Sequence, residues 1–180
     1  MKTTKKKIRT YILILAMIMT MLPGMSVSVK ADDITSYGLW IGDEEVKSDH
    51  LSGTGWSYDP NTGTLTLNDY KYEGKGHTSS GNPGAIYSQN KLNIVLQGSS
   101  SVINTSDTSG WNCGIYLESG DLTISGSGTL NVTGGTGSTS HGISVYSGNL
   151  TISDATITAI GQKAMGSSGI FARGSVIINS

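Results

Sequence analysis

Aromatic and charged residues recur at matching places in three similar stretches of the chain, which begin at Gly114, Gly142 and Gly169. If the isoleucine after each glycine points into a core, the strand period of two turns every second side chain outward. Rings presented in this way suit stacking on the apolar faces of sugars, and neighbouring carboxylate and guanidinium groups can hydrogen-bond to sugar hydroxyls. We therefore expect a carbohydrate-binding surface made of Tyr116, Glu118, Tyr146, Phe171 and Arg173.

Two other interpretations of these side chains stay open. The aromatic residues could simply cover the outside of a sheet, or a long loop such as Ser99–Trp111 could cover them. Alanine at Tyr116 and Tyr146 separates the alternatives, because only a binding surface predicts that polysaccharide retention in an affinity gel is then lost.

The elements that would position these residues form a repeat. The pattern Gly-Ile-x-x-x-x-Gly-x-Leu-Thr-Ile begins at Gly114 and again at Gly142. Related stretches place glycines at positions 84, 114, 142 and 169, which are 30, 28 and 27 residues apart. The stretch Gly63–Asn68 lies one period before Leu92–Leu96. Self-similarity at such a period is typical of stacked repeat architectures.

Each repeat holds three short stretches in which apolar and polar residues alternate. In the second repeat these are Ile115–Leu117, Leu122–Ile124 and Leu130–Val132, separated by Gly, Ser or Asn. Alternation predicts strands, and the breaks predict turns. Three strands in each period predict one rung of an all-β parallel β-helix, with rungs about 4.8 Å apart. An antiparallel sandwich is the alternative, but it does not predict near-identity at a long period.

Inward side chains of one rung would then stack on their equivalents in the next, so that a few large residues fill a narrow core. The expected partners are Ile115, Leu117, Leu122, Ile124, Leu130 and Val132 on Ile143, Val145, Leu150, Ile152, Ile157 and Ala159.

Residues 32–76 differ from the repeats and are rich in aromatic side chains. The first rung of a solenoid presents an open edge, which invites association unless it is covered. We therefore expect residues 32–76 to form an N-terminal aromatic β cap and residues 77–180 to form the rungs. The chain stops at Ile177–Ser180, inside an expected strand, so we expect further rungs in a longer protein or on another chain. The aromatic residues of the expected cap are Tyr37, Trp40, Trp56, Tyr58, Tyr70 and Tyr72.

Residues 1–31 have the pattern of a secretory signal peptide. Five basic residues among the first ten are followed by the apolar stretch Tyr11–Leu22. Val29 and Ala31 stand at the −3 and −1 positions of a cleavage site before Asp32. The apolar stretch is shorter than the about 20 residues that a membrane anchor needs. We expect a secreted or cell-surface protein with no stable membrane span after cleavage.

The net charge and the single cysteine limit the kinds of partner that we expect this chain to bind. After Ala31, six basic residues stand against 13 acidic ones, which gives the mature chain a formal net charge of −7. Nucleic-acid binding needs a basic surface, so we expect no nucleic-acid partner. The single cysteine, Cys113, cannot form an intramolecular disulfide. We expect a small buried residue at this position, with a bond to another chain as the alternative.

Other motifs do not indicate catalysis or metal binding. His50, His77 and His141 share no metal-ligand spacing and are expected at the surface or in turns. Thr133–Gly137 lacks the Asp of glycine-rich Ca²⁺ repeats and the Lys of a P-loop, so we expect a turn there. We expect no catalytic residue, no metal ligand and no cofactor.

Two stretches, Tyr37–Gly42 and Trp56–Tyr70, and the recurring Gly-Asp-Leu-Thr-Ile and Gly-Ile-Tyr elements resemble a recurrent module of large secreted surface proteins of Gram-positive gut bacteria. Those proteins resemble the pectate-lyase-like β-helix superfamily and are often described as carbohydrate-binding. The resemblance runs from about Tyr37 to the end of the chain and implies a right-handed parallel β-helix. Such helices carry lyases, hydrolases, adhesins and binding modules alike, so the fold alone does not set the function.

The enzymes of that superfamily need carboxylate clusters for Ca²⁺ or for acid–base catalysis. The motifs Asn104–Asp107 and Ser140–Gly142 match the hydrolase pattern only in part. No expected column of the stack carries two acids; those of the repeats are Asp107, Glu118, Asp121 and Asp154.

Two functional hypotheses follow. The first is an extracellular non-catalytic carbohydrate-binding or adhesive scaffold, whose partner is a polysaccharide or surface glycan. The alternative is the N-terminal part of a polysaccharide lyase or glycoside hydrolase, whose catalytic rungs lie beyond Ser180.

Overall fold

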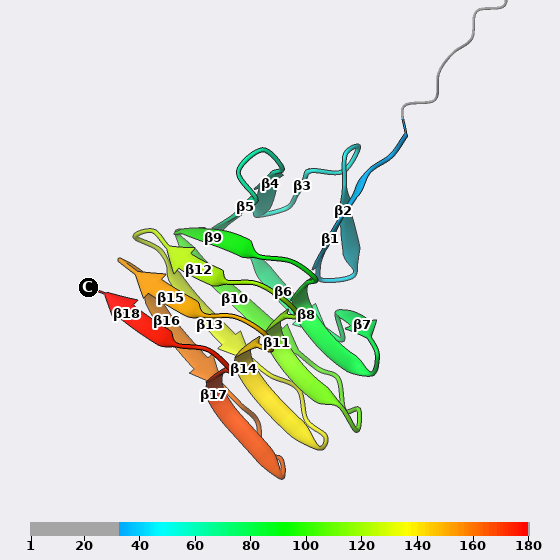
Figure 1. The fold of residues 1–180 in the computed structure, drawn as a ribbon, viewed down its shortest axis with the longest axis vertical. Helices are drawn as coiled ribbons and strands as arrows, with labels where there is room; N and C mark the ends of the chain where they lie inside the picture. The colour runs from blue at the N-terminus through cyan, green and yellow to red at the C-terminus, as the bar shows by residue number, and fades with distance from the viewer. Residues whose placement is uncertain (1–32, 180) are drawn as a thin grey trace, which may run out of the picture. The chain divides into compact units, whose positions relative to one another are not determined.

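Residues 33–179, the part that this computed structural model describes, contain β-strands and no helix (Figure 1). Within that range no segment is therefore a helix capable of crossing a membrane. The predicted signal peptide, residues 1–31, and its cleavage site before Asp32 lie outside the described residues.

The strands form three sheets, which we call sheets A, B and C. Sheet A consists, in order, of β17 (Gly166–Ala172), β14 (Thr139–Val145), β11 (Trp111–Leu117), β8 (Asn82–Ser88), β1 (Ser36–Ile41) and β2 (Glu44–Lys47), with β7 (His77–Ser79) also paired to β8. Sheet B consists of β18 (Val176–Asn179), β15 (Leu150–Ser153), β12 (Leu122–Ser125), β9 (Leu92–Gln97), β5 (Thr64–Asn68), β4 (Trp56–Asp59) and β3 (Ser52–Gly53). Sheet C consists of β16 (Thr156–Ile160), β13 (Thr129–Thr133), β10 (Ser99–Asn104) and β6 (Lys71–Gly74).

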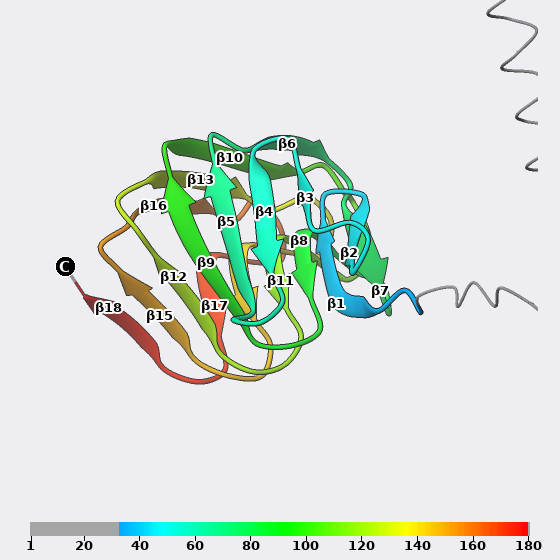
Figure 2. The same cartoon turned by 90° about the horizontal axis from the view of Figure 1, so that it is seen from above.

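The chain visits sheets B, C and A in turn and then repeats the circuit (Figure 2). Its rungs are β5–β6–β8, β9–β10–β11, β12–β13–β14 and β15–β16–β17, and β18 adds one more strand to sheet B. Strands of successive rungs pair in parallel in all three sheets. The predicted all-β parallel β-solenoid of three-stranded rungs is therefore confirmed, with about four turns.

Inward side chains stack in the predicted columns. Leu122 lies opposite Leu150, and Ile124 lies opposite Ile152. The other four predicted pairs are also in register in sheets A and C. Most of these side chains are buried in one continuous core, because each rung covers the apolar residues of the rung before it. The predicted upstream strand is also confirmed, since Leu65 of β5 lies opposite Ile94 of β9.

One part of the predicted register is wrong. Gly84 lies opposite Cys113 and not opposite Gly114, so the glycine does not continue the column of Gly114. The column position of Gly114 is taken by Ala85, since Ile86 pairs with Ile115. Alanine is the next smallest residue after glycine, so both Gly84 and Ala85 suit this position. The sequence comparison therefore aligned Gly84 with Gly114, where Ala85 belongs.

The first rung is flanked by antiparallel strands in two sheets. β1 pairs with β8 in sheet A, and β4 pairs with β5 in sheet B. Trp56 and Tyr70 of this N-terminal region are buried and belong to the main core. Parallel pairing already begins at β5, within the stretch 32–76 that the sequence assigns to a cap. The capping role of these strands stays a prediction.

The fourth rung leaves apolar side chains exposed. Ile157 and Ala159 face the core but are only partly buried. In β18, Val176 is 45% exposed and Ile178 is 67% exposed. Among the described residues no further strand pairs with β16, β17 or β18 on this side.

Candidate functional site: an aromatic face on sheet A

The outward side of sheet A carries a second cluster of buried residues, separate from the core. It contains Tyr87, Cys113 and Tyr116, with Trp111 and Tyr146 packed against them. Alternation along β11 does not place Cys113 and Tyr116 on one face, because they are three residues apart. The strand changes phase at Gly114, where an added Cβ would collide with the side chain of Val132 in the core.

This change of phase turns Trp111 and Cys113 outward beside Tyr116, and a buried polar column fixes the corner where it occurs. Asn104 Nδ2 donates to the carbonyl oxygen of Cys113 at 2.6 Å. Asn112 Nδ2 donates to the carbonyl oxygen of Thr139 in the next rung at 3.2 Å. Asn104 therefore holds the backbone of β11 from within the same rung, and Asn112 ties the start of β11 to the start of β14.

Rings on this outer side contact one another continuously from the first rung to the last. We call them the aromatic face: Trp40, His77, Tyr87, Trp111, Tyr116, His141, Tyr146 and Phe171.

In the N-terminal half of the aromatic face, Trp40 and His77 stack in parallel with centroids 3.8 Å apart. Both rings meet the edge or face of Tyr87, at 5.6 and 5.0 Å. Tyr87 lies 5.4 Å from Tyr116, which lies 6.4 Å from Tyr146. The spacings that involve Tyr87 and Tyr116 are those of favourable offset and edge-to-face ring pairs.

In the C-terminal half of the aromatic face, Trp111 contacts three other rings. Its ring makes edge contacts with His141 at 5.2 Å, Tyr146 at 5.4 Å and Phe171 at 4.9 Å. His141 and Phe171 stack with centroids 5.1 Å apart. The side chains of three successive rungs thereby form one patch.

Two charged groups border the rings. The Tyr87 hydroxyl donates to Glu118 Oε2 at 2.7 Å. The Arg173 guanidinium carbon lies 3.9 Å from the centroid of Tyr146, which is a cation–π contact. A carboxylate acceptor and a guanidinium donor thus lie beside the aromatic surface.

The residues of the predicted carbohydrate-binding surface differ in how far they are exposed. Tyr116 is only 4% exposed, so it supports neighbouring rings and offers little contact area. Glu118, Tyr146 and Phe171 are partly exposed, and Arg173 is exposed. The partly exposed rings of the aromatic face therefore lie at both of its ends, Trp40 and His77 at one end and Trp111, Tyr146 and Phe171 at the other. The predicted residues belong to the second group, on or next to β11, β14 and β17. Whether these residues bind a ligand stays a prediction.

The stretch Ser99–Trp111 is not the long loop that the sequence suggests. Its first six residues form β10 in sheet C, and the turn that follows is short. The stretch therefore reaches sheet A only at its end, where Trp111 itself joins the aromatic face.

The expected placement of the histidines is wrong for His141, which is 5% exposed inside β14. Its Nδ1 lies 2.7 Å from Ser168 Oγ. Burial lowers the pKa of His141 and of His77, so both rings favour the uncharged form. Neutral imidazoles can pack on aromatic neighbours without the cost of desolvating a charge.

Burial acts in the opposite direction on the acidic groups of the aromatic face. It raises the pKa of Tyr87 to about 12 and the pKa of the Cys113 thiol to about 12. Cys113 is a free, fully buried cysteine, as the favoured interpretation of the sequence predicted. Near neutral pH the Tyr87 hydroxyl and the Cys113 thiol therefore stay protonated.

Sequence reasoning missed Trp40, His77, Tyr87, Trp111 and His141 as members of the face. Tyr87 could have been found, because it falls opposite Tyr116 once Ile86 is aligned with Ile115. Trp111 and His141 could not, because they precede the glycine at which their strand changes phase. A strict period of two therefore assigns their side chains to the wrong side of the sheet.

Within residues 33–179, no group of three or more His, Cys, Asp or Glu side chains is arranged to hold a metal ion. Comparison of the chain with protein-family models, curated proteins and solved structures gave no match.

Proposed function

We propose that this chain is an extracellular, non-catalytic glycan-binding scaffold and that the aromatic face of sheet A is its binding surface. The observation that carries the proposal is the continuous line of ring contacts across successive rungs, which leaves rings partly exposed at both of its ends, Trp111, Tyr146 and Phe171 among them. A soluble domain with so few large apolar residues otherwise places them in its core.

The chemistry around Trp111, Tyr146 and Phe171 fits a carbohydrate. Partly exposed rings offer apolar faces to the C–H groups of a sugar ring. Glu118 accepts from hydroxyls and Arg173 donates to them, at the border of the same rings. Because successive rungs lie about 4.8 Å apart, these groups are spread along the solenoid axis, which suits an extended chain better than a single sugar.

The remaining predictions belong to the same proposal. The signal peptide would export the chain, and the formal net charge of −7 after Ala31 favours a neutral glycan over a polyanion. Membership of the pectate-lyase-like superfamily, right-handed coiling, an N-terminal cap and attachment to a Gram-positive surface are the expectations that the sequence resemblance adds.

Affinity electrophoresis in gels that contain a soluble neutral polysaccharide tests the proposal. Tyr146→Ala and Trp111→Ala should each reduce retention, because they remove partly exposed ring surface. Tyr58→Ala is the matched control, since Tyr58 is partly buried in β4 away from the aromatic face. Equal retention of all four proteins across a panel of polysaccharides would refute the assignment of the surface. Tyr116→Ala is less informative, because the loss of a buried ring also weakens the fold.

A further inference from the structure

A pocket lies in the N-terminal region, away from the aromatic face. It is a pocket of about 230 Å³ between the β1–β2 turn, β4 and β6. Nothing in the glycan-binding proposal uses it. Its chemistry-bearing walls are Asp43, Glu44, Trp56, Tyr70, Lys71 and Tyr72.

Both carboxylates of the pocket are positioned by side-chain contacts. The Tyr72 hydroxyl donates to Asp43 Oδ1 at 3.1 Å and accepts from the Gly76 amide at 2.9 Å. Glu44 Oε2 lies 3.0 Å from His50 Nε2, and the His50 ring makes an edge contact with Trp56 at 5.5 Å. The acids are therefore tied to the aromatic walls of the pocket.

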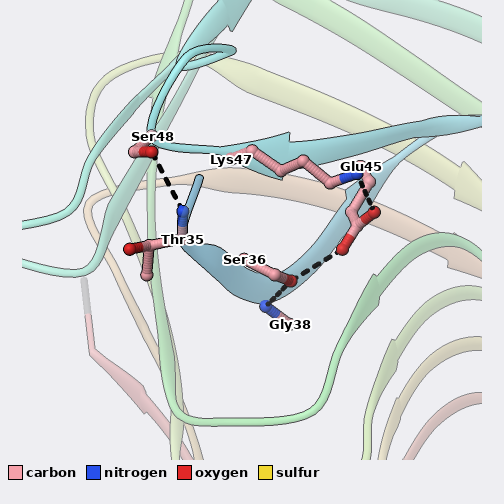
Figure 3. A network of polar contacts seen from close by, with 6 residues as sticks. All are labelled: Thr35, Ser36, Gly38, Glu45, Lys47 and Ser48. Carbon is pink, nitrogen blue, oxygen red and sulfur yellow. Dashed lines mark hydrogen bonds and ion pairs between the residues drawn. The ribbon is translucent and has the colours of Figure 1, made fainter. Parts of the chain in front are cut away.

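The hairpin that carries these acids is braced on its far side (Figure 3). Glu45 forms an ion pair with Lys47 at 2.6 Å and accepts from the Ser36 hydroxyl at 2.7 Å. Ser48 Oγ accepts from the Thr35 amide at 3.0 Å. Because Lys47 is engaged by Glu45, the nearest lysine in the sequence does not neutralise Asp43 or Glu44.

Tyr70 supplies a polar group without a protein partner. Its side chain is 5% exposed and lines the pocket, and no hydrogen bond to its hydroxyl occurs within residues 33–179. Burial, followed by the nearby Tyr72, Glu44 and Asp43, raises its pKa, so the hydroxyl stays protonated. Among the described residues, Ser144 Oγ is the one fully enclosed side-chain polar atom without a partner, so the Tyr70 hydroxyl keeps some exposure. Because Tyr70 lines the pocket, a ligand in it can pair with this hydroxyl.

We propose that this pocket binds the primary ammonium group of a small polar ligand of the amino-sugar kind. An ammonium has three donors, which the carboxylates of Asp43 and Glu44 can accept. Trp56 and Tyr72 add the aromatic surface that attracts a cation. The Tyr70 hydroxyl then pairs with a hydroxyl of the ligand. Lys71 is exposed at the rim and leaves the site with more negative than positive charge.

The test is an NMR titration of the ¹⁵N-labelled mature chain with glucosamine, followed at the Trp56 indole N–H. N-acetylglucosamine and glucose serve as matched neutral probes. We expect saturable shifts with glucosamine and at least about tenfold weaker binding of the two neutral sugars, since a charge-assisted contact in a partly enclosed site is worth on the order of 1.4 kcal/mol. Added salt should weaken glucosamine binding. Equal affinity for glucose and glucosamine, or no shift with either, would overturn the proposal.

Conservative variants separate a built site from general attraction to an acidic surface. Glu44→Gln and Asp43→Asn should each weaken glucosamine binding several-fold, whereas Glu73→Gln should not, because Glu73 is an exposed acid of β6 outside the pocket. Tyr70→Phe should weaken binding while leaving the unfolding midpoint unchanged or higher, because it removes an unpaired hydroxyl. An equal loss with Glu73→Gln would mean that only net charge matters. Polysaccharide retention by the aromatic face is measured separately, so either proposal can fail alone.

Discussion

Gly142 should tolerate no side chain, although its backbone angles suit any residue. It stands in β14 opposite Gly169 of the next rung, where the strand changes phase as β11 does at Gly114. A Cβ at this position would lie 2.7 Å from the Gly169 carbonyl oxygen and 2.7 Å from the Ile160 amide nitrogen. Both are backbone atoms of the stack, so neither can turn away as a side chain would.

The cost of Gly142→Ala follows from these contacts. Overpacking a well-packed interior costs about 1–3 kcal/mol, and two backbone collisions place this variant near the upper value, about 3 kcal/mol. For a domain of this size, each kcal/mol lowers the melting temperature by about 2–4 °C. We therefore expect Gly142→Ala to melt about 6–12 °C below the parent chain.

Gly166→Ala is the matched control for this experiment. A Cβ at Gly166 would meet Thr139 at 3.6 and 3.7 Å, which is ordinary contact. This variant should be neutral or slightly stabilising, because alanine restricts the unfolded chain. Thermal and urea unfolding, followed by tryptophan fluorescence, measure both variants. If Gly142→Ala unfolds at the same midpoint as Gly166→Ala, the close rung packing described above is wrong.

Three further predictions test other parts of the structure. The thiol of Cys113 and the hydroxyl of Tyr87 keep their protons in the folded state up to a pKa of about 12 but lose them near pH 9 and 10 when unfolded. Their contribution to the free energy of unfolding is complete below pH 9 and is lost as pH rises towards 12. The urea midpoint should therefore fall over this range, and it should fall less steeply in Cys113→Ala. Tyr87→Phe should lower the free energy of unfolding by about 1–2 kcal/mol at neutral pH, because Glu118 loses a donor; an unchanged urea midpoint would contradict that bond. A protein produced as residues 32–180, in which no described strand pairs with the outer edge of β18, should self-associate with rising concentration in sedimentation velocity, and Ile178→Lys should reduce this; identical profiles for the two proteins would show that the edge is not the contact.

The rungs could be predicted because the core is built from repeated identities. Leucine and isoleucine recur at the same offsets after each turn, and a one-residue slip would turn Leu122 and Ile124 to solvent. The small residues define the register less well, since both Gly84 and Ala85 are small enough for the crowded position next to Gly114. Only the register of Ile86 with Ile115 shows which of them occupies the column.

The candidate sites were harder to predict, because each depends on geometry that a period of two does not contain. The change of phase at Gly114 places Trp111 on the same side of sheet A as Tyr116. In the N-terminal region, antiparallel strands bring Asp43 and Glu44 beside residues 70–72, which are more than 25 positions away in the chain. Such contacts follow from how the first rung is flanked, and no local pattern marks them.

The most direct test of the central claim is the NMR footprint of a retained polysaccharide on the ¹⁵N-labelled chain. Ligand-induced shifts should concentrate on β11, β14 and β17 and include the Trp111 indole N–H and the Arg173 Nε–H. The outer residues of sheet B, such as Thr123 and Thr151, should stay unshifted. Shifts centred on sheet B or sheet C, with the Trp111 signal unmoved, would contradict the claim that the aromatic face binds the glycan.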